Sequence, residues 1–115
     1  GYTLLVSAPF VINNPLIETG LRWKPADFVP VARFALSPSY FVVPVDSAAK
    51  SVRDYVEMAK KSPGLLYGDG GTGSTQSMAI DMFKATAGIR LDPVMYKGAP
   101  PIVPDLVAGT LTMSV

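Results

Sequence analysis

The chain has 115 residues, of which 49% are apolar and 17% charged, so it suits one folded domain and lacks the composition of a disordered segment. Ten basic residues offset nine acidic ones at scattered positions, which argues against a nucleic-acid partner. Without Cys or His, the chain cannot form disulfides, the common zinc sites, thiol nucleophiles or His-based acid/base pairs.

The first third of the sequence predicts an irregular region with two strands. The Asn14-Pro15 pair indicates a turn or the start of a helix, and Pro25 indicates a loop. The expected elements are a buried strand over residues 2–7, a short helix over 16–21, a loop over 23–28 and a strand over 29–36. The sequence Ser37-Pro38-Ser39 interrupts this last strand before another begins over residues 40–45, so we expect a boundary or hinge there.

The remaining residues predict alternating helices and strands. Ser51 and Ser74 are candidate N-caps, Asp54 follows Ser51 in a weak capping box, and Gly88 ends the second helix. The order is a helix from Ser51 to about Ser62, a strand over 65–67, a helix from Ser74, and then a strand over 91–96, a helix over 101–107 and a strand over 111–115. This β-α-β order predicts an α/β fold with three layers, in which helices cover both faces of a mostly parallel sheet.

Apolar spacing predicts which face each of these helices buries. In the first helix the buried face comprises Val52, Tyr55, Val56 and Ala59. In the second helix we expect a core face made by Thr75, Met78, Ala79, Met82, Phe83 and Thr86.

Gly68, Gly70 and Gly73 have the G-x-G-x-x-G spacing of a dinucleotide site, between a predicted strand and a predicted helix. That site also needs an acidic residue at the end of the next strand, whereas Asp92 begins its strand. A phosphate-binding P-loop is disfavoured too, because Ser74 stands where the Lys should be. The nucleotide interpretations are therefore weak.

A second interpretation is that this loop binds one carboxylate. The backbone N–H groups of Gly71, Thr72, Gly73 and Ser74 precede a helix N-terminus, and the hydroxyls of Thr72, Ser74 and Thr75 add donors without adding charge. The alternative is purely structural, with glycines that make a tight turn and a serine that caps the helix.

The motifs taken together resemble a known family. Tyr67-Gly-Asp-Gly-Gly-Thr-Gly-Ser74, Tyr96-Lys97-Gly98 and Asp105-Leu-Val-Ala-Gly109 are similar in order and spacing to the receptors of tripartite tricarboxylate transporters, also called Bug receptors. The segments Gly1-Tyr-Thr-Leu-Leu5, Asn14-Pro15, Phe28-Val-Pro-Val-Ala32 and Pro63-Gly-Leu-Leu-Tyr67 agree. The resemblance covers essentially the whole chain.

This resemblance implies a periplasmic solute receptor without enzyme activity or cofactor, with two lobes of the type II periplasmic-binding-protein fold around a cleft. Residues 1–38 would be a remnant of lobe one and the approach to the hinge, and residues 39–115 would be lobe two. A signal peptide is not in the chain. The implied partners are a small organic anion, such as a di- or tricarboxylate, and membrane permease subunits. The implied ligand-binding residues are Gly71, Thr72, Gly73, Ser74 and Thr75, with Tyr96, Lys97 and Gly98.

Several other interpretations remain open. Lys97 is equally well explained as an exposed loop residue, and Asn13 and Ser7 are best explained as a turn former and a strand end. Trp23 is expected to pack within its own region. Other classes of protein with this pattern are the ligand-sensing domain of a cytoplasmic regulator and a dinucleotide-dependent enzyme. By itself the chain is expected to self-associate, because its first strands would expose apolar edges.

Overall fold

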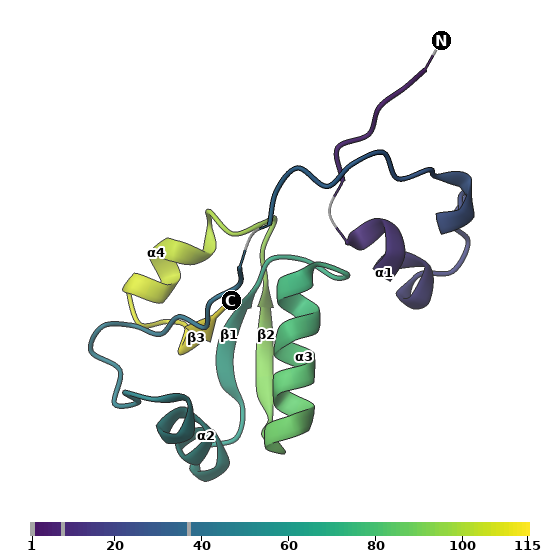
Figure 1. The fold of residues 1–115 in the computed structure, drawn as a ribbon. Coiled ribbons are helices and arrows are strands. Elements are labelled where there is room, and N and C mark those ends of the chain that lie inside the picture. The colour runs from purple at the N-terminus through teal and green to yellow at the C-terminus, as the bar shows by residue number, and fades with distance from the viewer. Residues whose placement is uncertain (1, 8, 37) are drawn as a thin grey trace.

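A computed structural model describes residues 2–7, 9–36 and 38–115, so Ser37 of the predicted break lies outside the described residues. Figure 1 shows a compact unit formed by the later residues, from which the first part of the chain extends away. Its elements in chain order are α1 (Phe10–Ile17), a 3-10 helix (Pro25–Asp27), α2 (Val52–Lys61), β1 (Leu65–Asp69), α3 (Thr75–Ala87), β2 (Leu91–Met95), α4 (Ile102–Val107) and β3 (Met113–Ser114).

The three strands form one parallel sheet in the order β2-β1-β3. Tyr67 in β1 lies beside Met113 in β3, and both pack with Leu91 of β2 in a core that α2 and α3 cover. Residues that point to the other face, such as Val94, pack with Ile102, Leu106 and Leu111 around α4. The predicted three-layer α/β arrangement with a mostly parallel sheet is therefore confirmed.

The close approach of α4 to the sheet depends on Gly68 in the middle of β1. A Cβ atom at Gly68 would lie 2.5 Å from Cγ2 of Ile102 and 3.0 Å from Cδ1 of Leu111. Ile102 and Leu111 are both buried, so neither can move aside easily. The glycine is thus required for packing at this position.

The predicted ends of the two longer helices are confirmed. The Ser51 Oγ accepts a hydrogen bond from Asp54 N–H at 3.2 Å, and the Ser74 Oγ accepts one from Ser77 N–H at 3.1 Å. Gly88 ends α3 in the left-handed conformation with φ of 62°. These caps satisfy backbone groups that have no partner within the helix.

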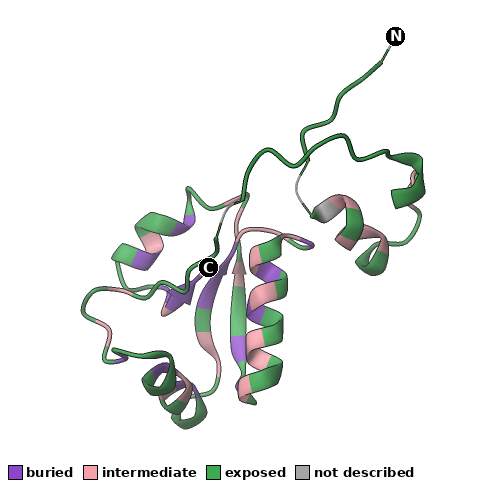
Figure 2. Ribbon diagram, in the orientation of Figure 1, coloured by how far each residue is buried: buried purple, intermediate pink, exposed green. Residues whose placement is uncertain are grey.

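The prediction of the buried face of α3 was wrong in part. Ile80 is fully buried and Ser77 is buried, whereas Met78 is 41% exposed and Met82 is 66% exposed. Phe83 is half-buried against the core, as expected. The helix carries apolar residues on two neighbouring stripes, and Ile80 packs in the core with Tyr67 and Leu91 of the sheet. Figure 2 shows that α3 has both buried and exposed positions along its length.

The strands predicted before residue 46 are wrong for the described residues. Residues 2–7 and 29–36 have no regular structure and are exposed, and residues 40–45 contribute only an antiparallel bridge between Val42 and Ser114. The short helix lies at Phe10–Ile17 and not at 16–21. A strand needs a pairing neighbour, and no described strand runs beside residues 2–7 or 29–36.

Trp23 makes an aromatic contact within the first part of the chain. The Trp23 ring packs edge-on against Phe28 with their centroids 5.5 Å apart, which confirms that Trp23 packs within its own region. Across the described residues, no helix has both the length and the apolar character needed to span a bilayer.

Candidate functional site

The two predicted ligand-binding segments meet at the carboxyl end of the sheet. Tyr96 N–H donates to Asp69 O at 2.8 Å, and Gly98 N–H donates to Gly70 O at 3.1 Å. Gly71 and Gly98 have φ of 130° and 96°, values that side-chain-bearing residues rarely adopt. Two backbone hydrogen bonds therefore join the last residue of β1 and the residues after it, together called here the glycine loop (residues 69–74), to the loop that follows β2.

The two loops leave the sheet from neighbouring strands, β1 and β2. The chain leaves β1 for α3 on one face of the sheet, and it leaves β2 for α4 on the other face (Figure 1). In open α/β sheets, ligands bind in the crevice outside the carboxyl ends of the strands, and the glycine loop leaves the carboxyl end of the central strand β1. The glycine loop, with the loop after β2 beside it, is therefore the candidate site.

Asp69 is a site residue whose role was not predicted from the sequence. The side chain is buried, with 4% of its surface exposed. One carboxylate oxygen accepts from Gly71 N–H at 2.9 Å, and the other accepts from the Ser77 hydroxyl at 2.9 Å. Asp69 therefore turns toward the first turn of α3 and holds the glycine loop to that helix.

These contacts limit which backbone N–H groups remain for a ligand. Gly71 N–H is used by Asp69, and Ser74 N–H donates to Gly71 O at 3.2 Å. Within the described part of the chain, the N–H groups of Thr72 and Gly73 make no hydrogen bond. Of the four predicted amide donors, these two have no hydrogen-bond partner among the described residues.

A residue from the first part of the chain also reaches this loop. The side-chain oxygen Oδ1 of Asn14 lies so close to Gly73 that a Cβ atom there would overlap it, and Ile17 lies beside it. Oδ1 is buried and makes no hydrogen bond to any described residue. The sequence indicated a turn at Asn14-Pro15, and nothing in its local pattern pointed to this contact.

The predicted side chains around the junction differ in exposure. The Tyr96 hydroxyl donates to the Asp105 carboxylate, and this hydrogen bond raises the pKa of Tyr96. Its ring packs against the α4 core, so the hydroxyl is engaged by α4. Gly73 is buried; Gly71, Ser74, Tyr96 and Gly98 are half-buried; Thr72, Thr75 and Lys97 are exposed.

Comparison with known proteins identifies the family. Residues 1–115 match the family described as "Tripartite tricarboxylate transporter family receptor". The chain belongs to this receptor family. A protein of Pseudomonas sp., "UPF0065 protein in tcbD-tcbE intergenic region", is 32% identical over 117 residues, covering all of this chain and 35% of its own. Protein BugT of Bordetella pertussis is 26% identical and covers all of this chain and 36% of its own.

Two similar solved structures agree with the fold. "R. palustris Rpa4515 with adipate" has a TM-score of 0.83 and 30% identity, over 92% of this chain and 36% of that one. "Structure of a periplasmic transporter" has a TM-score of 0.79 and 30% identity, over 90% of this chain and 35% of that one. The chain thus spans about a third of the length of the relatives it matches.

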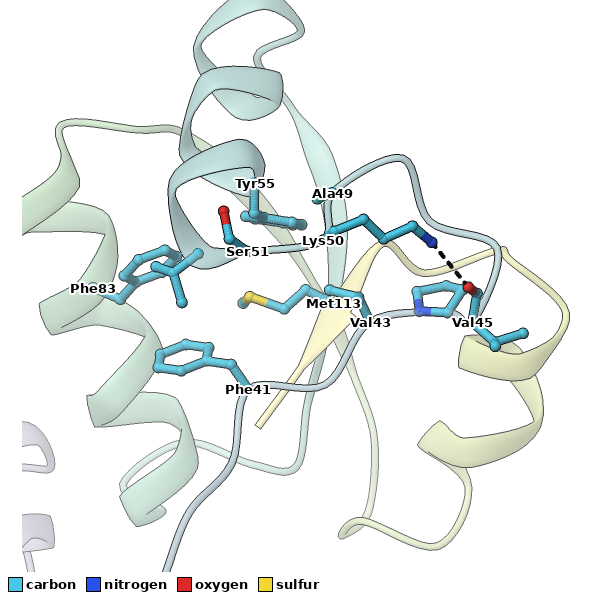
Figure 3. A pocket seen from close by; sticks show the side chains of 11 residues that line it. Phe41, Val43, Val45, Ala49, Lys50, Ser51, Tyr55, Phe83 and Met113 are labelled. Atoms are coloured by element: carbon cyan, nitrogen blue, oxygen red, sulfur yellow. Dashed lines mark hydrogen bonds between the residues drawn. The ribbon is translucent and has the colours of Figure 1, made fainter.

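One hollow of the receptor-family chain lies away from the two loops. It has a volume of about 420 Å³ between α2, residues 41–45 and Phe83, and Figure 3 shows Phe41, Tyr55 and Met113 pointing into it. The Lys50 amine donates to Val45 O at 3.3 Å at its rim, and Ser51 caps α2. An anion in this hollow would be desolvated against apolar side chains, so the hollow does not suit an organic acid.

Metal binding finds no support in the described residues. They contain no group of three acidic side chains close enough to hold a cation.

Proposed function

We propose that residues 39–115 form the second lobe of an extracytoplasmic solute receptor, which holds a small carboxylate for uptake. One carboxylate oxygen would accept from the free N–H groups of Thr72 and Gly73 at the N-terminus of α3, with hydroxyls of Thr72, Ser74 and Thr75 beside it. Tyr96, Lys97 and Gly98 would form the adjoining wall, where the Lys97 amine attracts anions. Residues 1–38 would belong to lobe one and the hinge approach.

The observation that carries this proposal is the junction of the two loops at the carboxyl end of the sheet. The hydrogen bonds from Tyr96 to Asp69 and from Gly98 to Gly70 fix that junction in a chain of a receptor family. The similar structure with adipate supports a carboxylate as the class of solute. The family also supports a periplasmic location, permease subunits as partners and a role without catalysis.

The dinucleotide interpretation is disfavoured by two carboxylates. Asp92 pairs with Leu66 near the amino end of β1, at the opposite end of the strand from the glycine loop. Asp69 already uses Gly71 N–H, and its negative charge would oppose a pyrophosphate. A regulator with the same fold would carry a DNA-binding helix-turn-helix before these residues, whereas a receptor would carry a signal peptide.

Calorimetry on the intact receptor tests the proposal. We expect adipate, citrate or a related carboxylate to bind, and NAD to leave the melting temperature unchanged. Gly73→Val should abolish binding, because φ of 79° and the contact with Asn14 leave no room for a side chain. A Met82→Val variant on the exposed side of α3 is the control. Binding of NAD, or unchanged carboxylate affinity in a folded Gly73→Val variant, would overturn the proposal.

A further inference from the structure

Asp105 lies in α4, in the motif Asp105-Leu-Val-Ala-Gly109, outside the two loops of the candidate site. Its carboxylate accepts a hydrogen bond from the hydroxyl of Tyr96, the first residue after β2. Its backbone carbonyl oxygen accepts from Thr110 N–H at 3.0 Å and from Leu111 N–H at 3.3 Å, just after the end of α4. Asp105 therefore joins the loop that follows β2 to α4.

The helix α4 is a fixed support for this contact. Ile102 and Leu106 of α4 are buried together with Leu111, and the Tyr96 ring packs against the same cluster. A Cβ atom at Gly68 would overlap Ile102, so α4 lies directly against β1. Because close-packed side chains have little room to move, α4 holds the Tyr96 side chain in one place.

The hydrogen bond to Asp105 also decides what the Tyr96 hydroxyl can offer a solute. A phenol has one proton to donate, and Tyr96 donates it to Asp105. This hydrogen bond and the negative charge of Asp105 raise the pKa of Tyr96, so the phenol stays protonated. The lone pairs that remain on its oxygen atom repel a carboxylate. The Tyr96 hydroxyl therefore cannot bind the carboxylate while it is bonded to Asp105.

The backbone of Tyr96 is the part of the residue that joins the glycine loop. Its N–H donates to Asp69 O at 2.8 Å, and Gly98 N–H donates to Gly70 O at 3.1 Å. The side chain of Tyr96 is anchored on α4 and its backbone is anchored on the glycine loop, so the residue is held at both ends. A shift of Tyr96 would move Lys97 and Gly98 relative to the glycine loop.

We propose that Asp105 is a positioning residue for solute binding, which holds Tyr96 on α4 and thereby keeps residues 97–98 beside the glycine loop before a solute arrives. The inference rests on the proposed function, because it gives a residue that does not touch the solute a role in the same site. A wall that is already in place loses less conformational entropy on binding, so the contact raises affinity. Tyr96 contributes through its backbone and not through its hydroxyl.

Calorimetry with adipate on the intact receptor tests this role. Tyr96→Phe removes the donor and Asp105→Leu removes the acceptor, so each should weaken adipate binding about five- to tenfold. The double variant should bind about as weakly as either single variant, because one interaction is lost in all three. If the Tyr96 hydroxyl bound the solute directly, Asp105→Leu would free its proton for the carboxylate. Tighter binding of adipate by Asp105→Leu would therefore overturn the inference.

Two further variants separate positioning from stability. The Tyr55 hydroxyl shares a hydrogen bond with Thr112 Oγ1 at 2.8 Å, and Tyr55 belongs to the core on the other face of the sheet. Tyr55→Phe thus loses one tyrosine hydrogen bond away from the site and should keep the wild-type affinity. Asp105→Asn keeps an oxygen acceptor and should retain most of the affinity that Asp105→Leu loses. An equal loss of affinity in Tyr55→Phe would mean that affinity follows stability alone, against a positioning role.

Titration of the Tyr96 phenol is a readout that does not need a solute. The phenolate absorbance that Tyr96→Phe removes from the wild-type spectrum belongs to Tyr96. In Asp105→Leu this phenol should ionise at a lower pH than in wild type, because the carboxylate that disfavours the phenolate is gone. An unchanged pKa of Tyr96 in that variant would exclude Asp105 as its partner.

The wild-type receptor and Tyr96→Phe together distinguish this inference from the proposed function. If the wild-type receptor binds neither adipate nor citrate, the proposed function and the positioning role fail together. If it binds adipate and Tyr96→Phe binds adipate equally well, the proposed function stands and the positioning role alone is refuted.

Discussion

Residues 2–36 and residues 49–115 are both rich in apolar side chains, but the two regions differ in how far they bury them. In the later region Tyr67, Ile80 and Leu111 are buried between helices and sheet. In the earlier region Leu4, Val31 and Phe34 are about 80% exposed. A strand-like pattern produces a strand only where a neighbour supplies hydrogen bonds and a covered face, so pattern and partner must be considered separately.

The largest expected effect is on the association state of the earlier region. The 115-residue chain by itself should form dimers or larger species in sedimentation, because exposed apolar segments pair with a second copy. Replacing Leu4, Val31 and Phe34 by Ser should shift it toward the monomer. Replacing Arg22, Lys24 and Arg33 by Ser is the control, since it keeps the apolar surface. A monomeric wild-type chain would contradict the prediction that the exposed apolar segments pair with a second copy.

In the later region, Ile80→Ala should lower the free energy of unfolding by about 2 to 5 kcal/mol, because it leaves a cavity beneath α3. Met82→Ala, two residues along the same helix, should change it by less than about 1 kcal/mol, since Met82 is 66% exposed. Urea denaturation of both variants measures the difference. Equal losses would mean that the exposed stripe of α3 is covered in solution.

The contact between β1 and α4 is tested by two glycines two residues apart. Gly68→Ala should cost about 1 to 3 kcal/mol, because the new methyl group overlaps Ile102. At Gly70 the nearest atom to an added Cβ is 3.7 Å away, so Gly70→Ala should fold with nearly wild-type stability. Equal midpoints in urea for the two variants would show that α4 does not pack as described.

Two serine caps separate stability from binding. Ser74→Ala and Ser51→Ala each remove an acceptor from a helix N-terminus and should each cost about 1 kcal/mol of stability. Only Ser74→Ala should also weaken carboxylate binding, by about 1 to 3 kcal/mol, if its hydroxyl bonds the charged solute. Calorimetry and thermal melting on both variants provide the two readouts. Equal affinities for the two variants would place Ser74 outside the binding site.

The smallest expected effect depends on pH. The Ser51 side chain and the Lys50 N–H hold the pKa of Asp54 below its usual range. Because the pKa is lowered in the folded state, Asp54 stabilises the protein above the unfolded value near 3.8, and this contribution is lost as the pH falls through the folded value. Asp54→Asn should therefore be less stable than wild type at pH 6, and the difference should shrink as the pH falls through the folded pKa of Asp54. Glu57→Gln on the same helix is the control.

The fold of the later region was largely predictable because its signals are local. Ser51, Ser74 and Gly88 mark helix ends through contacts three or four residues away, and the β-α-β order constrains the sheet. The choice between the Ile80 and Met82 stripes of α3 was not predictable, because both are apolar and the sheet decides between them. The earlier strands failed for a related reason, since their pairing partners are not encoded in their own pattern.

The candidate site was predictable in position and less so in detail. The glycine spacing and Tyr96-Lys97-Gly98 located the two loops, and their hydrogen bonds bring them together. The role of Asp69 was not predicted, because its contact with Ser77 depends on how the loop folds back onto α3. The Asn14 contact joins residues 59 positions apart in the chain, and no local pattern reports such a contact.

The two hydrogen bonds of Asp69 also have a kinetic consequence. They fix the glycine loop to α3 in the free chain, so the loop does not have to become ordered when a solute arrives. Less conformational entropy is then lost on association, and the encounter rate depends on diffusion into the crevice and on the charge of the solute. Solutes of equal charge should therefore arrive at similar rates and differ chiefly in how long they stay bound.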